Sequence, residues 1–364
     1  MSGEDPKRAP KSRGRNPPLS RPASSSSLRI PDVDFELVNA AKRIAEGALG
    51  VVAGERLVII ADKARHDLGV AIHDAARLAG AKVALTILED LGPRPHRYVH
   101  EQLKTELANA QASVLLAGFE EGEQAMRVEL VIELVRKLNL RHAHMVGVTR
   151  RSMLTGFSVD PARVLDATRA VRTRVRPDSV LHLRTAAGSD LEVKLHPGYR
   201  WLEHVGVIRP GRWENLPSGE LVTTPATASG VFVADASMGG HFGQTAGLLT
   251  KRPVRLEIDG GVCKGARCPD LGLQLEVERF LKAEPNGDRL GLVGLGTNVG
   301  IHAPIGDVSC DQNMPGLTLG FGSTFADQTG ASWNARTQIT FTCTEADVDL
   351  DGAPLLRRGR YMIS

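Results

Sequence analysis

The feature that most constrains the fold of this chain is a regular alternation of helical and strand-like segments over residues 33–148. The segment RLVIIA at 56–61 is a short apolar run between Gly54 and Asp62, as expected for a strand that is buried on both faces. The expected order is helix 33–51, strand 56–61, helix 67–78, strand 82–88, helix 96–109, strand 113–117, helix 122–138 and strand 144–148. Such alternation predicts a parallel sheet that is covered by helices and joined by right-handed crossovers.

Polar residues follow several of these predicted strands. Because domains of this class often bind ligands at the carboxyl ends of their strands, we expect these residues to line a cleft. The residues are Asp62, Glu89, Glu120 and Thr149. Neither a G-x-G-x-x-G turn after a strand nor a G-x-x-x-x-G-K-[ST] loop is present, which disfavours a dinucleotide or ATP site.

The pattern changes in the second half of the chain. Residues 180–196 alternate with period two on both sides of a turn at 188–190, which predicts a β-hairpin. Further expected elements are helix 161–171, strands 230–236, 254–258, 289–295, 317–321, 337–342 and 346–350, and helix 272–283. The predicted fold is an α/β N-terminal domain with a parallel sheet, at 30–175, followed by a mostly antiparallel α+β catalytic-like domain at 176–364.

Positive charge is concentrated in residues 1–29. This segment contains seven Lys or Arg and two acidic residues, so its net charge is +5, and the whole chain at +3 leaves −2 for the remainder (3 − 5). A surface of that charge is not typical of nucleic-acid binding, and we expect no nucleic-acid partner. Since residues 1–29 are rich in Pro, Ser and Arg and poor in apolar residues, we predict a disordered basic arm.

The cysteines and the apolar segments bear on the compartment. Cys263 and Cys268 are separated by four residues, which matches no common zinc spacing. We therefore expect free thiols in a cytoplasmic protein, with a local disulfide between Cys263 and Cys268 as the alternative. The chain lacks the apolar core of a secretory signal and any run of about 18 apolar residues, so we expect no membrane partner.

Several short motifs occur in an order that is informative together. They are VAGERLVIIAD at 52–62, VTRRSML at 148–154, NLPSGE at 215–220, GLGTN at 294–298, the glycine-spaced run 316–322, the segment 329–340 and Asp351-Gly352. In this order and spacing the chain resembles the thermophilic metalloprotease family, of the aminopeptidase T and aminopeptidase S type, including its 2,5-dihydroxypyridine dioxygenase-like branch. The resemblance covers residues 33–360. It implies a two-domain, aminopeptidase-like hydrolase that forms dimers.

The resemblance also implies a metal centre, and most of its positions hold other residue types here. In the family, the motif that ends at Glu220 supplies a carboxylate ligand, which this chain retains. A second glutamate position holds Leu292, and a histidine position falls at or next to Thr318. The closing H-x-D pair falls on Gln338 and Thr340. Because Leu cannot coordinate a metal and neutral Thr or Gln binds divalent cations weakly, we expect a degenerate site with no metal and no other cofactor.

The sequence leaves three functions open, of which the first is favoured. In this reading the protein is a metal-independent, hydrolase-like enzyme, not a conventional metallopeptidase, that acts on a peptide or a small amide or aromatic substrate in the interdomain cleft. Glu220 is its catalytic acid or base, and His241, on the glycine-rich loop 238–243, is a second catalytic candidate. The expected substrate-binding residues are Thr318, Gln338, Thr340 and Asn298.

The second reading is a non-catalytic ligand-binding protein or the partner subunit of another enzyme. The third is a metal-dependent aminopeptidase or ring-cleaving dioxygenase whose ligands have moved. The candidate relocated ligands are His241, His302, Asp307 and Asp311. In each reading we expect a homodimer or a complex with a partner enzyme.

Overall fold

The first part of the chain builds a parallel five-stranded sheet. The structure, a computed structural model, describes residues 34–239, 242 and 245–362. The sheet has the order β2-β1-β3-β4-β8, and its neighbouring strands all run parallel. Its strands are β1 (Arg56–Ala61), β2 (Lys82–Ile87), β3 (Ala112–Leu116), β4 (Arg141–His144) and β8 (Arg212–Asn215). The surrounding helices are α1 (Phe35–Lys42) with a π-helical segment Arg43–Ala48, α2 (His66–Leu78), α3 (Glu101–Ala108), α4 (Gln124–Val128), a π-helical segment Glu129–Leu134 and α5 (Val135–Lys137).

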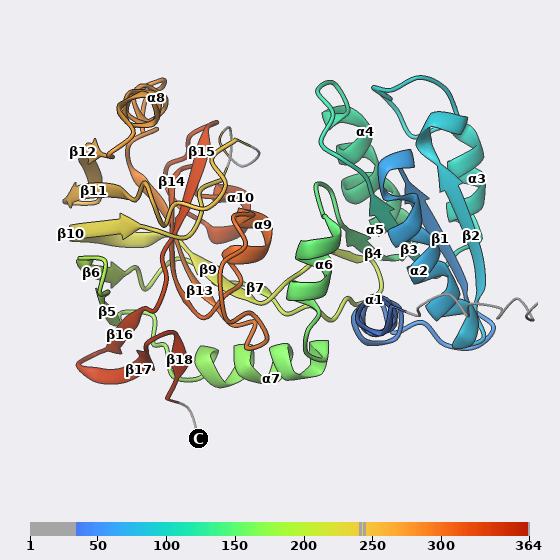
Figure 1. Cartoon of the computed structure of the whole chain (residues 1–364), viewed down its shortest axis with the longest axis horizontal. Helices are drawn as coiled ribbons and strands as arrows, with labels where there is room; N and C mark the ends of the chain where they lie inside the picture. The colour runs from blue at the N-terminus through green and yellow to red at the C-terminus, as the bar shows by residue number, and fades with distance from the viewer. Residues whose placement is uncertain (1–33, 240–241, 243–244, 363–364) are drawn as a thin grey trace, which may run out of the picture. The chain divides into compact units, whose positions relative to one another are not determined.

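Alternate residues of β1 face two different layers of helices. Leu57 and Ile59 belong to one buried core with residues of α1 and α2. Val58 and Ile60 belong to a second core with residues of α3 and α4. The helices α2, α3 and α4 surround this sheet in Figure 1, and the two cores place α2 on one face and α3 and α4 on the other. Because both faces are buried, an uninterrupted apolar run is the sequence that this strand requires.

The second part of the chain builds two antiparallel sheets. One has eight strands in the order β12-β11-β10-β6-β5-β16-β17-β18, and the other has five in the order β15-β14-β13-β9-β7. The eight are β5 (Val180–Arg184), β6 (Asp190–Leu195), β10 (Pro225–Ala234), β11 (Val254–Asp259), β12 (Val262–Arg267), β16 (Asp347–Leu350), β17 (Ala353–Arg357) and β18 (Arg360–Tyr361). The five are β7 (Leu202–His204), β9 (Glu220–Thr223), β13 (Leu290–Gly296), β14 (Gly316–Gly322) and β15 (Gln338–Thr342). The accompanying helices are α6 (Arg150–Gly156), α7 (Pro161–Arg172), α8 (Leu271–Leu281), α9 (Val308–Asp311) and α10 (Ala326–Thr329).

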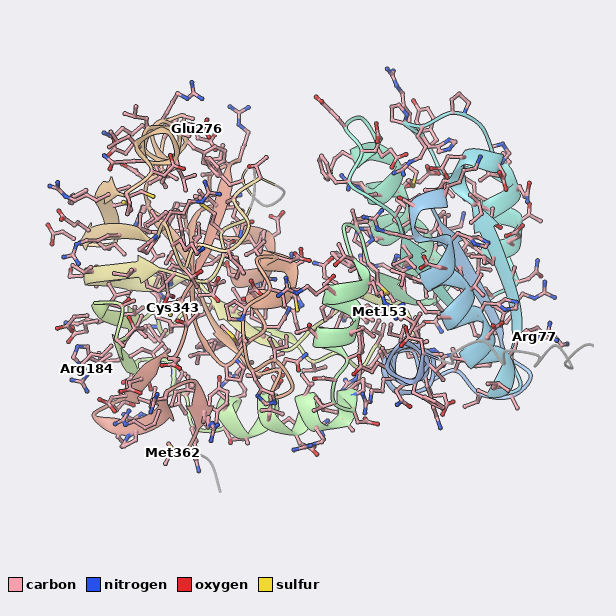
Figure 2. The ribbon with its side chains drawn as sticks, viewed as in Figure 1. Arg77, Met153, Arg184, Glu276, Cys343 and Met362 are labelled. Atoms are coloured by element: carbon pink, nitrogen blue, oxygen red, sulfur yellow. The ribbon has the colours of Figure 1, made fainter. Side chains whose placement is uncertain are left out.

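A single large core joins the two antiparallel sheets. It contains the inward-facing residues of both, such as Phe232, Leu319 and Phe341. Cys343 lies within this packed interior, whereas Arg184 and Glu276 are exposed at its surface (Figure 2). All four cysteines of the chain are buried and free, which confirms the expectation of free thiols.

The predicted fold class is confirmed. One strand lies earlier in the chain than expected, and the structure contains several short elements that were not predicted. The strand expected at 144–148 ends at His144 instead, because Gly147 adopts a positive φ of 80° in the turn that follows. The sequence did not predict the short strands β7, β8, β9, β12, β17 and β18 or the helices α6, α9 and α10. The predicted domain limits stay a prediction, and β8 shows that sheet membership crosses residue 175. No helix in the described ranges is both long enough and apolar enough to cross a membrane.

Candidate functional site

The five-stranded antiparallel sheet has one apolar face and one polar, glycine-rich face. Leu319 and Phe321 of β14 and Phe341 of β15 point into the large core. Because side chains alternate across a strand, Thr318 and Thr340 lie on the opposite face. The glycines that alternate with the core residues leave the backbone of that second face open to a ligand.

A cavity of about 460 Å³ lies on this second face. The sheet contributes His204 from β7, Glu220 and Val222 from β9, Leu292 and Gly294 from β13, Thr318 and Gly320 from β14, and Gln338 and Thr340 from β15. The other walls are Asn215, Pro217 and Ser218 before β9, Val308, Ser309, Gln312 and Asn313 at α9, and Phe325. The volume suits a small organic ligand.

The structure thus brings together the residues at the five positions of the implied metal centre. Glu220 and Leu292 lie on the two neighbouring strands β9 and β13, and Thr318 follows on β14. Gln338 and Thr340 lie on β15, the next strand. These residues are up to 120 positions apart in the sequence (340 − 220), and the antiparallel register places them on one wall. Their convergence is a property of the fold, whereas their roles stay a prediction.

Glu220 is a buried carboxyl group without a hydrogen bond from any described residue. It is 7% exposed, and burial raises its pKa to about 8. Gly294 makes room for it, since a Cβ atom there would lie 2.6 Å from Oε1 of Glu220. Gly219 has a φ of 127°. A Cβ atom at this position would lie 2.8 Å from the backbone nitrogen of Asn298, so only glycine fits here. At pH 7 Glu220 is therefore protonated and able to donate a hydrogen bond.

Asn298 supports the loop that precedes Glu220. Its Nδ2 donates to the carbonyl oxygens of Gly156 and Ser218, each at 2.9 Å. Its Oδ1 accepts from the N–H of Gly300 at 3.1 Å. With a 1% exposed side chain it ties α6 to the NLPSGE loop and is not part of the cavity wall. The predicted contact with a substrate stays untested, and the geometry places Asn298 as a supporting residue.

Glu214 is a neighbouring, partly buried carboxyl group that the sequence did not point to. Its Oε2 accepts from the N–H of Gly206 at 2.8 Å and from Oγ of Ser218 at 3.1 Å. Burial raises its pKa to about 7, although these hydrogen bonds oppose the shift. The available signal was its place in WENLPSGE, five residues before the glycine that precedes Glu220. Glu214 orients Ser218, which lines the cavity.

His204 is the second ionisable group of the described cavity wall. It lies opposite Glu220 in the pairing of β7 with β9. Burial lowers the pKa of its imidazole, so the ring is neutral at pH 7. The sequence offered no motif around His204, because β7 is only three residues long.

The described relocated-ligand candidates either are exposed or accept local backbone hydrogen bonds. His302 is exposed, Asp307 caps α9 by accepting from the N–H of Ser309 at 3.0 Å, and Asp311 accepts from the N–H groups of Ile305 and Gly306 at 2.8 and 2.9 Å. His241 lies outside the described residues.

The groups that line the cavity do not fit a tightly bound transition metal. Among residues 34–239, 242 and 245–362, no group of three or more His, Cys, Asp or Glu side chains is placed to hold a metal ion. Among groups that could coordinate a metal, the described cavity wall offers one carboxyl group and one imidazole beside neutral hydroxyls and amides. Hydrolytic metal sites need several carboxylate or imidazole ligands that converge on one point.

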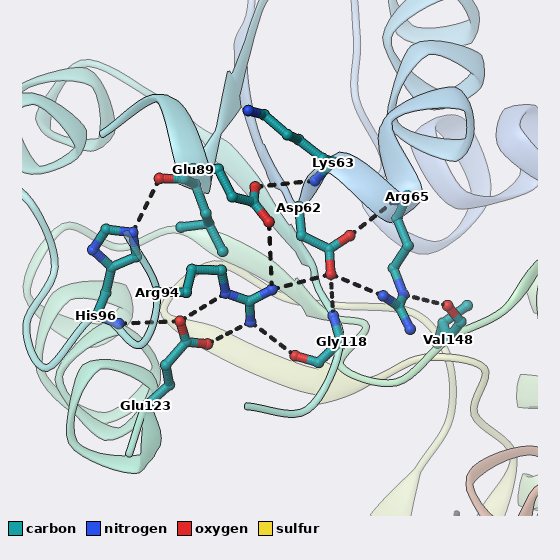
Figure 3. A network of polar contacts seen from close by, with 10 residues as sticks. Asp62, Lys63, Arg65, Glu89, Arg94, His96, Gly118, Glu123 and Val148 are labelled. Atoms are coloured by element: carbon teal, nitrogen blue, oxygen red, sulfur yellow. Dashed lines mark hydrogen bonds and ion pairs between the residues drawn. The ribbon is translucent and has the colours of Figure 1, made fainter. Parts of the chain in front are cut away.

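The carboxyl edge of the parallel sheet, where the sequence predicted a cleft, is filled by ion pairs (Figure 3). Asp62, at the end of β1, accepts from the N–H of Gly118 at 2.6 Å and from Nη1 of Arg65 at 2.8 Å. Arg94 lies between Asp62, at 3.2 Å, and Glu123, to which it donates two hydrogen bonds of 2.8 and 2.6 Å.

The remaining residues of the predicted cleft also have structural positions. Glu89 accepts from the N–H of Lys63 at 3.0 Å and lies 3.9 Å from Arg94. Thr149 caps α6 together with Ser152, and Glu120 is exposed. We conclude that Asp62, Glu89 and Thr149 have structural roles and that the candidate site is the cavity at Glu220.

Comparison with known proteins shows a shared fold and no match at the level of sequence. No protein-family model matches the sequence, and no curated protein sequence matches it. Among solved structures, the 2,5-dihydroxypyridine dioxygenase from Pseudomonas putida KT2440 is similar with a TM-score of 0.61 and 18% identity, over 90% of this chain and 96% of that one. AmpT from Thermus thermophilus is similar with a TM-score of 0.62 and 17% identity, over 90% of this chain and 99% of that one. At such identities the likeness establishes that this chain has the two-part fold of these proteins.

Proposed function

We propose that this protein is a metal-independent enzyme that acts on a small amide or ring substrate in the cavity, with Glu220 as the proton-transferring residue. The observation that carries the proposal is a buried carboxyl group without a hydrogen-bond partner among the described residues, in a cavity whose other described walls are mainly neutral. A pKa of about 8 makes Glu220 a general acid at pH 7, and it becomes a base above about pH 8. Thr318, Gln338 and Thr340 are close enough along the same wall to orient the substrate.

The energetics of Glu220 support a functional role. Keeping a carboxyl group protonated at pH 7, when its ordinary pKa is 4.5, costs about 3 kcal/mol relative to the unfolded chain. No hydrogen bond from a described residue offsets this cost. A perturbed carboxyl group in a cavity is a candidate for catalysis, because function tolerates such local losses of stability.

The chemistry that the geometry supports is acid catalysis at a polarised group. The carboxyl proton of Glu220 can be donated to a carbonyl oxygen or to a leaving nitrogen that lies on the sheet floor. The neutral imidazole of His204, on the adjacent strand, can accept a proton from water or from substrate. Both groups come from the sheet, which holds them rigidly.

Replacement of Glu220 by Gln tests this function. The variant keeps the shape and loses the exchangeable acid, so we expect turnover of an amide substrate to fall by about 10² to 10⁴ with little change in ligand affinity. Initial rates on a panel of aminoacyl and N-acyl p-nitroanilides give the measurement. Gln338→Ala is the matched control, which is expected to raise KM more than it lowers kcat. Full turnover in Glu220→Gln would remove this residue from the mechanism.

The absence of a required metal is part of the proposal and is tested separately. The donor set of the cavity predicts that protein purified without chelator holds well under one equivalent of zinc, iron, manganese or cobalt. Elemental analysis measures this content, and assays with and without EDTA show whether turnover depends on it. A stoichiometric transition metal that EDTA removes together with activity would favour the metal-dependent reading.

We further propose that the protein assembles as a homodimer or with a partner enzyme. The support is the low net charge of residues 30–364, which does not oppose self-association. Light scattering at micromolar concentration is the test, and a clean monomer without a co-purifying partner contradicts it.

A further inference from the structure

The described wall of the cavity contains no positive charge. None of its described residues is Lys or Arg, and its ionisable groups are Glu220 and His204. With a neutral His204, the wall is neutral when Glu220 is protonated and negative when Glu220 is ionised. A bound anion would therefore lose its hydration without gaining a cationic partner in either state.

Six neutral polar side chains of the wall have unused hydrogen-bonding capacity. Their side chains make no hydrogen bond to another described residue, in contrast to Ser218, whose hydroxyl donates to Glu214. The six are Asn215, Ser309, Gln312, Thr318, Gln338 and Thr340. Each hydroxyl or amide group can both donate and accept, so together they match an uncharged ligand that carries donors and acceptors.

Phe325 adds an aromatic surface to the same cavity. Its backbone has a φ of 49°, in the left-handed region that bulky residues rarely adopt. The surrounding loop holds it there, since the carbonyl oxygen of Phe325 accepts from the N–H of Thr329 at 2.9 Å and its own N–H donates to Oγ of Ser323 at 3.3 Å. Its side chain is 37% exposed and lines the cavity. A strained residue at a cavity wall indicates a functional position.

The glycine at position 320 opens space opposite these groups. A Cβ atom there would lie 3.2 Å from Cβ of Leu292 and 3.6 Å from Nε2 of Gln338. Its absence leaves a planar group free to approach the strand beside Gln338.

We propose that the cavity selects an uncharged carboxamide whose planar body lies against Phe325, and that it rejects the corresponding carboxylate. The proposal rests on the proposed function for the choice of site and adds the substrate class. A carboxamide presents one acceptor and two donors, which match the amide of Gln338 and the hydroxyls of Thr318 and Thr340. A peptide substrate would bring a charged terminus into the cavity, whereas a carboxamide ligand needs no charge.

The selectivity has a consequence for the reaction. Hydrolysis breaks the C–N bond of the amide, forms a C–O bond from water, and releases ammonia and a carboxylic acid, which ionises near pH 7. The carboxylate finds no cation on the described wall. Release of the product is therefore favoured by the same charge distribution that admits the neutral substrate.

Calorimetric titration of the full chain with benzamide, benzoate and benzyl alcohol, which share one ring, tests the proposal. We expect benzamide to bind and benzoate to bind at least about tenfold more weakly. Benzoate binding as tight as benzamide, tighter binding of benzyl alcohol, or no benzamide binding at millimolar concentration overturns it.

Two variants sharpen the test. Phe325→Ala is expected to weaken benzamide binding about tenfold, whereas Phe119→Ala, which removes a 57% exposed phenylalanine that is not part of the cavity wall, should leave it unchanged. Gln338→Lys places a cation on the wall and is expected to reverse the preference, so that benzoate binds more tightly than benzamide. Retained preference for benzamide in Gln338→Lys would contradict selection by charge.

These measurements need no turnover, so the two proposals can fail separately. Unchanged turnover in Glu220→Gln removes the proposed mechanism and leaves the binding preference standing. Equal binding of benzamide and benzoate removes the preference and leaves Glu220 as a candidate acid.

Discussion

Buried carboxyl groups at the edge of the parallel sheet are paired with a cation, whereas the buried carboxyl group of the cavity, Glu220, has no described cation beside it. Glu123 and Asp62 have side chains 2% and 4% exposed, and both contact Arg94. Burial by itself raises the pKa of Glu123, but hydrogen bonds from Arg94 and from the N–H of His96 outweigh it and lower the pKa. Glu220 is buried as well, and burial alone determines its raised pKa.

This difference separates a structural cluster from a candidate site. Around Arg94 each described charge has a partner at hydrogen-bonding distance, so the cluster is stable and has little remaining capacity for a ligand. Around Glu220 the described wall has an acid without a described partner and several donors and acceptors that make no hydrogen bond to another described residue. Charged residues at a strand end are thus a weaker sign of function than an isolated buried group.

One of the two largest expected effects concerns the pH dependence of stability at Glu220. Its folded pKa of about 8 lies above the ordinary 4.5, so its contribution to stability is fully present below pH 4.5 and is lost as the pH rises through 8. Glu214, with a pKa of about 7, adds a loss of the same sign. We expect Glu220→Gln to remove up to about 4 kcal/mol of the decline in unfolding free energy between pH 5 and pH 8.5.

Urea denaturation of wild type and variant at the two pH values measures this difference. Glu276→Gln, at an exposed position of α8, is the matched control and should decline as wild type does. An identical decline in Glu220→Gln and wild type would show that Glu220 is not the group responsible.

The other large expected effect is the loss of the ion-pair cluster. Arg94→Met keeps much of the side-chain volume and leaves Asp62 and Glu123 without their shared cation, so we expect the unfolding free energy to fall by about 3 to 5 kcal/mol. Arg77→Ala, at an exposed position of α2, should change it by less than about 0.5 kcal/mol. Both values come from urea denaturation at pH 7. A change below 1 kcal/mol in Arg94→Met would contradict the structural role of the cluster.

The smallest expected effect on stability comes from Gly294→Ala. The added methyl group would lie 2.6 Å from Oε1 of Glu220 and must displace its carboxyl group. We expect a loss of about 1 to 2 kcal/mol in thermal unfolding, together with weaker benzamide binding. Gly265→Ala is the control, because a Cβ atom at this β12 position has no neighbour within 4 Å. Equal behaviour of the two variants would mean that the space beside Glu220 is not needed.

Much of the candidate site was implied by the resemblance of short motifs to those of a known family, since such motifs can be recognised within one segment of sequence. The glycine-spaced run 316–322 and NLPSGE led to Thr318 and Glu220, which the structure places on one wall. Phe325 and Glu214 were not predicted as site residues. The neighbouring sequence does not show that a phenylalanine adopts a left-handed conformation or that a carboxyl group accepts a hydrogen bond from a serine. The strand expected at 144–148 was wrong for a local reason, the turn at Gly147.

The sequence by itself determined the layered fold class. Burial on both faces requires runs such as 56–61, and burial on one face requires the alternation seen at 180–196, so periodicity reveals how many faces of a strand are covered. Only the tertiary structure decided which carboxyl groups are paired with a cation. Arg94 reaches Asp62 across 32 positions and Glu123 across 29, whereas no described cation lines the cavity of Glu220. Pairing of charges depends on distances of a few ångströms between remote segments, and these distances follow from packing.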